Sequence, residues 1–253
     1  MSFIGRRSAY RPSPVFLALV AAWIAGGAMA WYEFGNATVN VLLFVVAGWV
    51  VSLSLHEFSH ALFAYRSGDR SVAGRGYLTL NPLKYTHPLL SIGLPILFLL
   101  LGGIGLPGGA VWVDRHAING RGKNSLISLA GPAANIVFLL LLTIPFAIGV
   151  DVYPHLTFWA SVAFLAFLQL TAAVLNLLPV PGLDGGNAVR PWLSGDVAKL
   201  FDYITPFGLL ILFALFYTPL GGIFFAVVRF LSDAIGVPRD LASTGYDLLR
   251  FWD

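Results

Sequence analysis

The sequence contains no cysteine and little charge. Without cysteine the chain has no disulfides and no thiolate metal ligands, so a bound zinc ion would have to be held by His, Asp or Glu. Charged residues make up 11% of the 253 residues and hydrophobic residues 58%, whereas ordinary soluble domains are about 25% charged. The composition therefore predicts an integral membrane protein. The net charge of +3 is small, and no concentrated basic face for nucleic acid is visible.

Long polar stretches are also absent. No polar segment approaches the roughly 50 residues of a small soluble domain, so residues 1–253 are expected to form one integral membrane domain. Its core is expected at about 39–190. Residues 191–253 are expected to form a C-terminal connector and a last membrane segment.

Five apolar runs predict transmembrane helices, so the expected fold class is an all-α polytopic membrane protein with five to six spans. The runs cover residues 14–32, 39–65, 124–150, 155–178 and 206–228. The first run also resembles a signal peptide ending in Ala-Met-Ala, but its length and the membrane segments behind it favour a retained helix. Pro219 and two glycines interrupt the last run, which could be one kinked span or a tight hairpin.

Basic residues predict which ends of the spans face the cytoplasm. Arg6, Arg7 and Arg11 precede the first run, and Arg66 and Arg70 follow the second. Cytoplasmic loops carry an excess of Lys and Arg. We therefore expect a multi-pass protein of the cell (inner) membrane with its N-terminus in the cytoplasm.

The uncharged stretch 85–113 does not fit a simple span. Three prolines and several glycines interrupt it, and spanning would place Arg115, Arg121 and Lys123 outside. A re-entrant segment buried against protein avoids that conflict. The β-prone residues 110–113 predict a short strand, so we also expect a small membrane-associated β-hairpin.

A polar motif, His56-Glu57-x-x-His60, stands inside the second run. A charged group in a spanning helix costs about 2.5–3.5 kcal/mol on insertion scales, so such residues need partners or a function. On a helix the i, i+4 spacing places both imidazoles on one face, which is a zinc-binding pattern with Glu57 beside the metal. Glu57 precedes Arg66 by nine residues, or roughly 13 Å. The motif would therefore lie within the bilayer, nearer its cytoplasmic face.

A hydrolytic zinc site needs a third protein ligand. Asp184 follows the fourth run, and two glycines after it allow close backbone approach. With 85–113 re-entrant, Asp184 falls on the same side of the membrane as the two histidines, and we favour it as the ligand. The alternative is that it caps the following helix. His87 and His116 are interpreted as interfacial polar residues, and His155 lies on the outer side.

Together these residues resemble the site-2 proteases, which are intramembrane zinc metalloproteases. The resemblance rests on the HExxH motif in a transmembrane helix, on Asn-Leu-Leu-Pro at 176–179 and on Leu-Asp-Gly at 183–185. It covers about residues 39–190, which would then be the catalytic core. It implies one Zn²⁺ per chain, held by His56, His60 and Asp184. It also implies that Glu57 is the catalytic acid/base.

Further positions fit the same family. Asn176 matches a residue that binds substrate or stabilises the oxyanion, although an inter-helix hydrogen bond is an alternative. Gly131, Pro132 and Asn135 match a segment that supports the site, and for Asn135 helix packing at a small-residue interface is the favoured explanation. Many members carry a PDZ domain, and the resemblance is to a member without one.

The function implied is hydrolysis of peptide bonds within transmembrane segments of other membrane proteins, known as regulated intramembrane proteolysis. Membrane-anchored regulators are the expected kind of substrate, and the lipid bilayer is the expected surrounding. One alternative is a membrane metal-binding or transport protein that uses the same three ligands. Another is an inactive family member acting as a membrane chaperone. Transport would need neither Glu57 nor Asn176. A homo-oligomer or an adaptor protein stays open.

Overall fold

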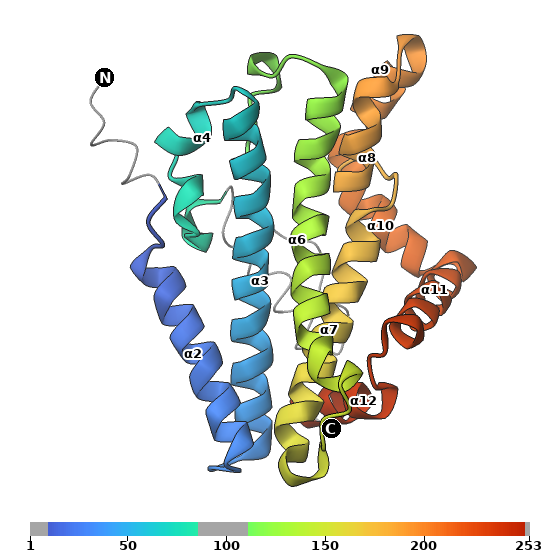
Figure 1. Ribbon diagram of the computed structural model, residues 1–253. Coiled ribbons are helices and arrows are strands. Elements are labelled where there is room, and N and C mark those ends of the chain that lie inside the picture. The colour runs from blue at the N-terminus through green and yellow to red at the C-terminus, as the bar shows by residue number, and fades with distance from the viewer. Residues whose placement is uncertain (1–9, 86–110, 251–253) are drawn as a thin grey trace.

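The computed structural model describes residues 10–85 and 111–250, and four long helices dominate this part of the chain (Figure 1). They are α2 (Pro14–Trp31), α3 (Ala37–Ser67), α6 (Arg121–Ala147) and α7 (Leu156–Asn176). Each lies within three residues of a predicted apolar run at both ends. All four are long and apolar enough to cross a membrane, which identifies a polytopic helical membrane protein.

Local sequence signals set the starts of the first two helices. Ser13 accepts the N–H of Phe16 and precedes a proline, so α2 has both a capping side chain and a suitable first residue. Asn36 caps α3 by accepting the N–H of Val39. α2 packs tightly on α3 at Gly26, where the absence of a side chain allows close approach. A Cβ at this position would lie only 2.7 Å from the backbone nitrogen of Phe44.

The order of contacts shows that α3 and α6 run antiparallel. His60 contacts Ile127 and His56 contacts Asn135, so the sequence order reverses between the two helices. The chain between α3 and α6 therefore leaves and returns at the same end of the bundle, as Figure 1 also shows. The re-entrant segment predicted for 85–113 lies outside the described residues, apart from residue 85 and residues 111–113.

Short helical turns cover that end of α3. They are α4 (Ser71–Gly74), η1 (Tyr77–Thr79), η2 (Pro82–Lys84) and η4 (Arg115–Ala117). Residues of α4 and η1, together with Tyr85 after η2 and Ile118 after η4, form a small hydrophobic core with Ala61 and Ala64 of α3 and with Ile127 of α6. This core fixes the chain on either side of residues 86–110 against the end of α3 that carries the polar motif.

The predicted β-hairpin is wrong. Residues 111–113, the described part of the expected strand, have no regular secondary structure, and residues 10–85 and 111–250 contain no strand. The physical reason is where the backbone donors go. The N–H of Val111 donates to the Glu57 carboxylate, and that of Asp114 donates to the Asp69 carboxylate. Side chains of α3 and the loop after it take the bonds that a partner strand would need.

The described residues contain four candidate spans, or five if one bent helix pair is counted as a span, so they reach at most the lower end of the predicted five to six. Residues 206–228, predicted as one kinked span or a tight hairpin, are divided between α10 (Gly208–Phe216) and α11 (Pro219–Ile235). Pro206 and Pro219 lack the N–H that a continuous helix needs at these positions. The resulting α10 has nine residues, about 13 Å at 1.5 Å per residue, which is far short of a bilayer.

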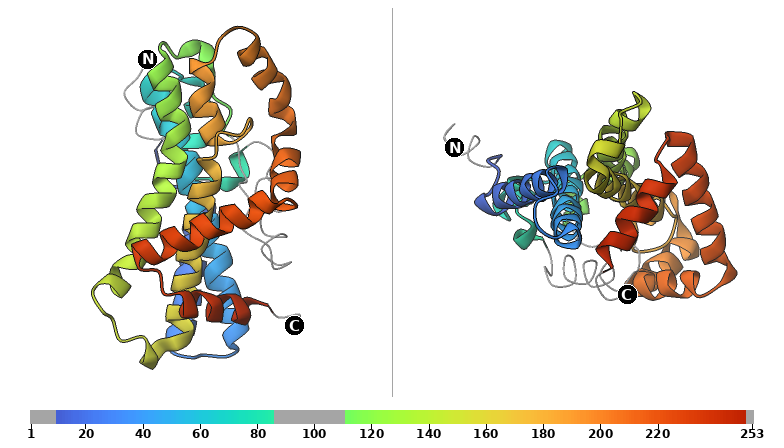
Figure 2. Two further views of the ribbon diagram at one scale, coloured as in Figure 1. Left: turned by 90° about the vertical axis from the view of Figure 1, so that its right-hand side faces the viewer. Right: turned by 90° about the horizontal axis from the view of Figure 1, so that it is seen from below.

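Seven short elements follow α7 in the described part of the chain, of which α11 and α12 pack on α7, while α8 and η6 pack on α6. They are α8 (Asp184–Val189), η6 (Arg190–Trp192), α9 (Gly195–Ile204), η7 (Thr205–Phe207), α10 (Gly208–Phe216), α11 (Pro219–Ile235) and α12 (Arg239–Leu249). Figure 2 shows α10 and α11 set at an angle beside the bundle and α12 lying across it. A Cβ on Gly245 would lie 2.3 Å from the carbonyl oxygen of Ala160. α12 is therefore packed directly on α7, which enters from the turn η5 (Tyr153–His155).

Candidate metal centre

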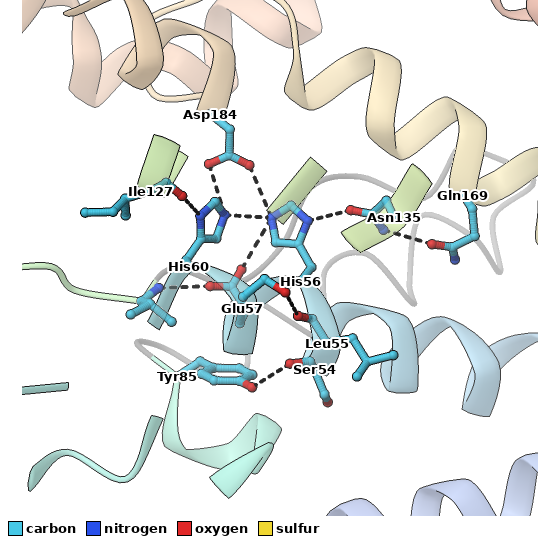
Figure 3. A network of polar contacts seen from close by, with 12 residues as sticks. Ser54, Leu55, His56, Glu57, His60, Tyr85, Ile127, Asn135, Gln169 and Asp184 are labelled. Carbon is cyan, nitrogen blue, oxygen red and sulfur yellow. Dashed lines mark hydrogen bonds and ion pairs between the residues drawn. The ribbon is translucent and has the colours of Figure 1, made fainter. Parts of the chain in front are cut away.

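Two histidines of α3 face the same point inside the bundle (Figure 3). His56 and His60 are one helical turn apart, and their Nε2 atoms are 3.1 Å apart. Their side chains are buried, although the helix is long enough to cross a membrane. A helix that buries two imidazoles at one point offers two nitrogen ligands from a single rigid element.

Asp184 completes the cluster from the other side. Its Oδ2 atom lies 3.2 Å from Nε2 of His56 and its Oδ1 atom 3.3 Å from Nε2 of His60. Asp184 is the first residue of α8, so the loop after α7 carries the carboxylate back toward α3. The structure thus brings together the three residues that the sequence predicted as ligands.

The spacing of these atoms fits a zinc ion. Tetrahedral zinc with bonds of about 2.0–2.1 Å has ligand atoms about 3.3–3.4 Å apart. The three distances here are 3.1, 3.2 and 3.3 Å. Two imidazoles and one carboxylate form a hydrolytic zinc ligand set, since they leave a coordination position for water or substrate.

Two glycines let Asp184 reach this position. A Cβ on Gly185 would lie 2.2 Å from the carbonyl oxygen of Leu177, and one on Gly186 would lie 2.0 Å from that of Val180. The first turn of α8 is therefore packed against the backbone of the loop that precedes it. The sequence-based expectation of close backbone approach at these glycines is confirmed.

A third glycine lies at the cluster itself. A Cβ on Gly131 of α6 would lie 2.2 Å from Nε2 of His60 and 2.5 Å from Nε2 of His56. No side chain fits there without displacing an imidazole. Gly131 therefore keeps open the space toward which both ligand nitrogens point.

The opposite ring nitrogens are held by α6. Nδ1 of His60 lies 2.6 Å from the carbonyl oxygen of Ile127, and Nδ1 of His56 lies 2.5 Å from Oδ1 of Asn135. Pro132 lacks the N–H that would bond to the carbonyl of Ser128, so one backbone hydrogen bond of α6 is missing next to Ile127. With protons on both Nδ1 atoms, both Nε2 lone pairs are available to a metal.

Glu57 lies next to the cluster without joining it. Its Oε1 atom is 4.0 Å from Nε2 of His56, which is longer than the distance between two ligand atoms of one tetrahedral zinc ion. Its Oε2 atom accepts the N–H of Val111 at 3.0 Å. The side chain is buried. Beneath it, the Tyr85 hydroxyl donates to the Ser54 carbonyl. One carboxylate oxygen is therefore anchored and the other faces the metal centre.

Asp69, which the sequence analysis did not single out, fixes the segment that reaches Glu57. It is 1% exposed and accepts the N–H groups of Ser71 and Asp114, both at 2.8 Å. Because Asp114 is three residues from Val111, these two hydrogen bonds also fix the position of the Val111 N–H. An acidic residue after a predicted span usually indicates an exposed turn, so the sequence carried no signal for this role.

The segment that carries Asp184 is also tied to α6. The hydroxyl of Ser125 donates to the carbonyl of Ala188 at 2.6 Å, and the indole of Trp192 donates to the same hydroxyl at 2.9 Å. Further along the chain, Arg190 and Asp202 form a bidentate ion pair. Hydrogen bonding to Arg190 lowers the pKa of the Asp202 carboxyl. These contacts hold α8 on the helix that also orients both histidines.

The remaining predicted residues are placed as follows. Asn176 ends α7 and is buried, and its amide has no hydrogen-bond partner among the described residues. His116 is exposed in η4, away from the cluster of ligands. His155 stacks on Trp31 at the far end of the bundle. His87 lies outside the described residues.

Comparisons with known proteins place this centre in a family. The chain is 50% identical over 252 residues to "Putative zinc metalloprotease Rip2" of Mycolicibacterium smegmatis, covering 97% of this chain and 96% of that protein. It is 49% identical over 257 residues to the protein of the same name from Mycobacterium tuberculosis, covering 100% of this chain and 98% of that protein.

A more distant relative is "Putative zinc metalloprotease YwhC" of Bacillus subtilis, which is 29% identical over 189 residues, or 72% of this chain and 84% of that protein. No family model and no solved structure matches the chain. Because about half of its residues are shared with Rip2 over nearly the full length of both proteins, the chain belongs to the site-2 protease family of membrane zinc metalloproteases.

Proposed function

We propose that this protein is a zinc-dependent intramembrane endopeptidase. The observation that carries the proposal is a pair of buried histidines on a helix long enough to cross a bilayer, which meets the half-buried Asp184 of α8 and has a non-ligating glutamate beside it on the same helix. Transport of a metal ion has no use for a carboxylate held beside the ligands. Hydrolysis needs such a group as its base.

His56, His60 and Asp184 are proposed to hold the zinc ion. When bound there, zinc supplies Lewis-acid polarisation of a peptide carbonyl and lowers the pKa of water from about 15.7 to about 7. The protein contributes the geometry. Hydrogen bonds from the two Nδ1 atoms fix both rings, and the Gly185 and Gly186 contacts fix the carboxylate.

Glu57 is proposed to move the proton. Its anchored Oε2 atom leaves Oε1 facing the centre, where it accepts a proton from the attacking water. The oxygen of that water bonds to the carbonyl carbon, and the proton then passes to the leaving nitrogen as the C–N bond breaks. Asn176, whose buried amide has no hydrogen-bond partner among the described residues, is proposed to donate to the developing oxyanion or to the substrate backbone.

The substrates are proposed to be transmembrane segments of other membrane proteins, such as membrane-anchored regulators. The two histidines of the cluster lie in the C-terminal half of α3, a helix long and apolar enough to cross a membrane. A substrate helix must unwind locally to reach it, because an intact helix has all its backbone groups paired.

Removal and return of zinc test this function directly. The purified protein is expected to contain one zinc ion per chain and to cleave a model single-pass substrate in detergent or liposomes. A strong chelator should reduce cleavage to background, and added zinc should restore it, since the ligands sit on rigid helices. Cleavage products are identified by mass spectrometry. A zinc-loaded protein that leaves a panel of transmembrane substrates intact would contradict the proposal.

The metal centre is proposed to lie toward the cytoplasmic side. Arg66, Arg70 and Lys123 lie at the end of the bundle nearer the cluster, and the opposite turns carry Glu33 and Asp151. Because the chain has no cysteine, single cysteines can report the side of each turn.

In intact cells, a membrane-impermeant maleimide is expected to label Tyr153→Cys, at the far turn, and to leave Gly122→Cys unlabelled until the membrane is opened. Tyr153 is 86% exposed, and nothing lies within 4 Å of a Cβ on Gly122, so both sites tolerate the change. The reverse pattern of labelling would refute the orientation.

A further inference from the structure

We propose that Gln169 is a positioning residue that fixes the protonated nitrogen of His56 and so keeps its Nε2 lone pair available to the metal. Gln169 lies on α7, does not touch the cluster, and acts through Asn135. The inference rests on the proposed function, because it assigns Gln169 a role toward the zinc ion of that site.

The need for such a residue follows from the chemistry of imidazole. A neutral histidine carries its proton on only one ring nitrogen, and the hydrogen bond to the other nitrogen selects which one. His56 presents Nε2 to the cluster, so Nδ1 must carry the proton and its partner must accept. That partner is Asn135, whose amide has an accepting oxygen and a donating nitrogen and by itself could present either.

A chain of hydrogen bonds removes this ambiguity. Nδ2 of Asn135 donates to Oε1 of Gln169 at 2.8 Å, and Nε2 of Gln169 donates to the Ser52 hydroxyl at 2.8 Å. The Ser52 hydroxyl in turn donates to the backbone carbonyl of Trp49 at 2.8 Å. A carbonyl can only accept, so the direction of every bond back to His56 is set at this end. Reversing either amide would bring two donors or two acceptors face to face.

Burial prevents water from relaxing this constraint. Gln169 is 0% exposed, Ser52 3% and Asn135 4%. Three different helices, α3, α6 and α7, supply the members, so the chain also fixes how these helices meet. Figure 3 shows Asn135 between His56 and Gln169 in this arrangement.

The second histidine provides a contrast within the same site. Nδ1 of His60 bonds directly to the Ile127 backbone carbonyl, an obligatory acceptor that needs no side chain to orient it. The two imidazoles thus reach the same protonation pattern by different routes. Only the protonation pattern of His56 can be altered by replacing a side chain that does not touch the histidine.

The experiment compares two replacements of Gln169. Gln169→Met has a similar volume but makes no hydrogen bonds, and it is expected to weaken zinc binding about 10- to 100-fold. Gln169→Glu is expected to stay close to the parent, because a protonated carboxyl in this buried place accepts from Asn135 and donates to Ser52 as the amide does. Zinc affinity is measured by chelator competition, and the visible spectrum of the cobalt-substituted protein reports the ligand geometry.

Thr171→Val is the matched control. Thr171 is buried on the same helix, but its hydroxyl donates only to the Phe167 carbonyl within that helix. Its loss is expected to leave zinc affinity and the cobalt spectrum unchanged. All variants are compared as monodisperse folded protein by size-exclusion chromatography.

Each outcome decides the proposal. Parent-like zinc affinity in Gln169→Met would overturn it, and so would an equal loss in Gln169→Met and Gln169→Glu, which would indicate a general disturbance of packing at this position rather than a loss of hydrogen-bond direction. If Gln169→Met does not fold, Ser52→Ala tests the same chain from its anchored end, and parent-like affinity there would overturn it. A parent protein that binds no zinc would instead refute the proposed function itself.

Discussion

Replacing Gly131 with alanine is expected to abolish zinc binding and with it all proteolysis. The added methyl carbon would lie 2.2 Å from Nε2 of His60 and 2.5 Å from Nε2 of His56, in the space that the metal must use. α6 cannot move aside easily, because the Ile127 carbonyl and Asn135 of the same helix hold both rings. Avoiding the methyl would break the bonds that orient the ligands.

The measurement is zinc stoichiometry of the purified protein, with cleavage as a second readout. Gly122→Ala is the control, since it lies in the same helix and a Cβ there meets nothing within 4 Å. It is expected to bind zinc fully and to stabilise the helix slightly, by about 0.5–1 kcal/mol. Full zinc occupancy in Gly131→Ala would mean that the imidazoles can withdraw, and the rigid centre described above would be wrong.

Glu57→Gln is expected to lower the cleavage rate by about 100- to 10,000-fold, the range for loss of a general acid–base, while zinc stays bound. The amide keeps the shape of the side chain, and its oxygen can still accept the N–H of Val111. It cannot take a proton from water. Zinc content is unaffected because Glu57 is not within bonding range of the ligand cluster.

Steady-state cleavage of a transmembrane substrate, together with metal analysis, checks this expectation. The chain has only one other glutamate, Glu33, on the turn at the far end of α3, and Glu33→Gln should match the parent in both measurements. Loss of zinc together with activity in Glu57→Gln would show that the carboxylate supports the metal. A rate close to the parent's would remove Glu57 from catalysis.

The parts of this protein that the sequence predicted share one property: they depend on local patterns. Apolar runs define the four long helices, and the i, i+4 histidines define a ligand pair without knowledge of the fold. Asp184 is the exception, because its prediction required counting the spans before it to find which side of the membrane each loop occupies. The position of Asp184 in the structure follows the same logic.

The parts that the sequence did not predict depend on tertiary partners. Residues 111–113 have β-prone side chains, but the N–H groups of Val111 and of the following Asp114 bond to acidic side chains of α3 and the loop after it. Gln169 is one amide in a long apolar helix, and its role requires knowing that Asn135 and Ser52 lie on either side of it. The C-terminal run was apolar enough to span, yet it is divided into α10 and α11, of which α11 packs on α7.

Helix α7 is the common reference for two of the three ligands. Gln169, near its middle, governs the tautomer of His56, and the loop from its end places Asp184. A slide of this helix along its axis by one turn, about 5.4 Å, would move Asp184 away from the two histidines and Gln169 away from Asn135. Zinc held by His56, His60 and Asp184 would therefore join α3 to the segment that leaves α7, and the zinc content of the protein would report whether these two helices keep their relative position.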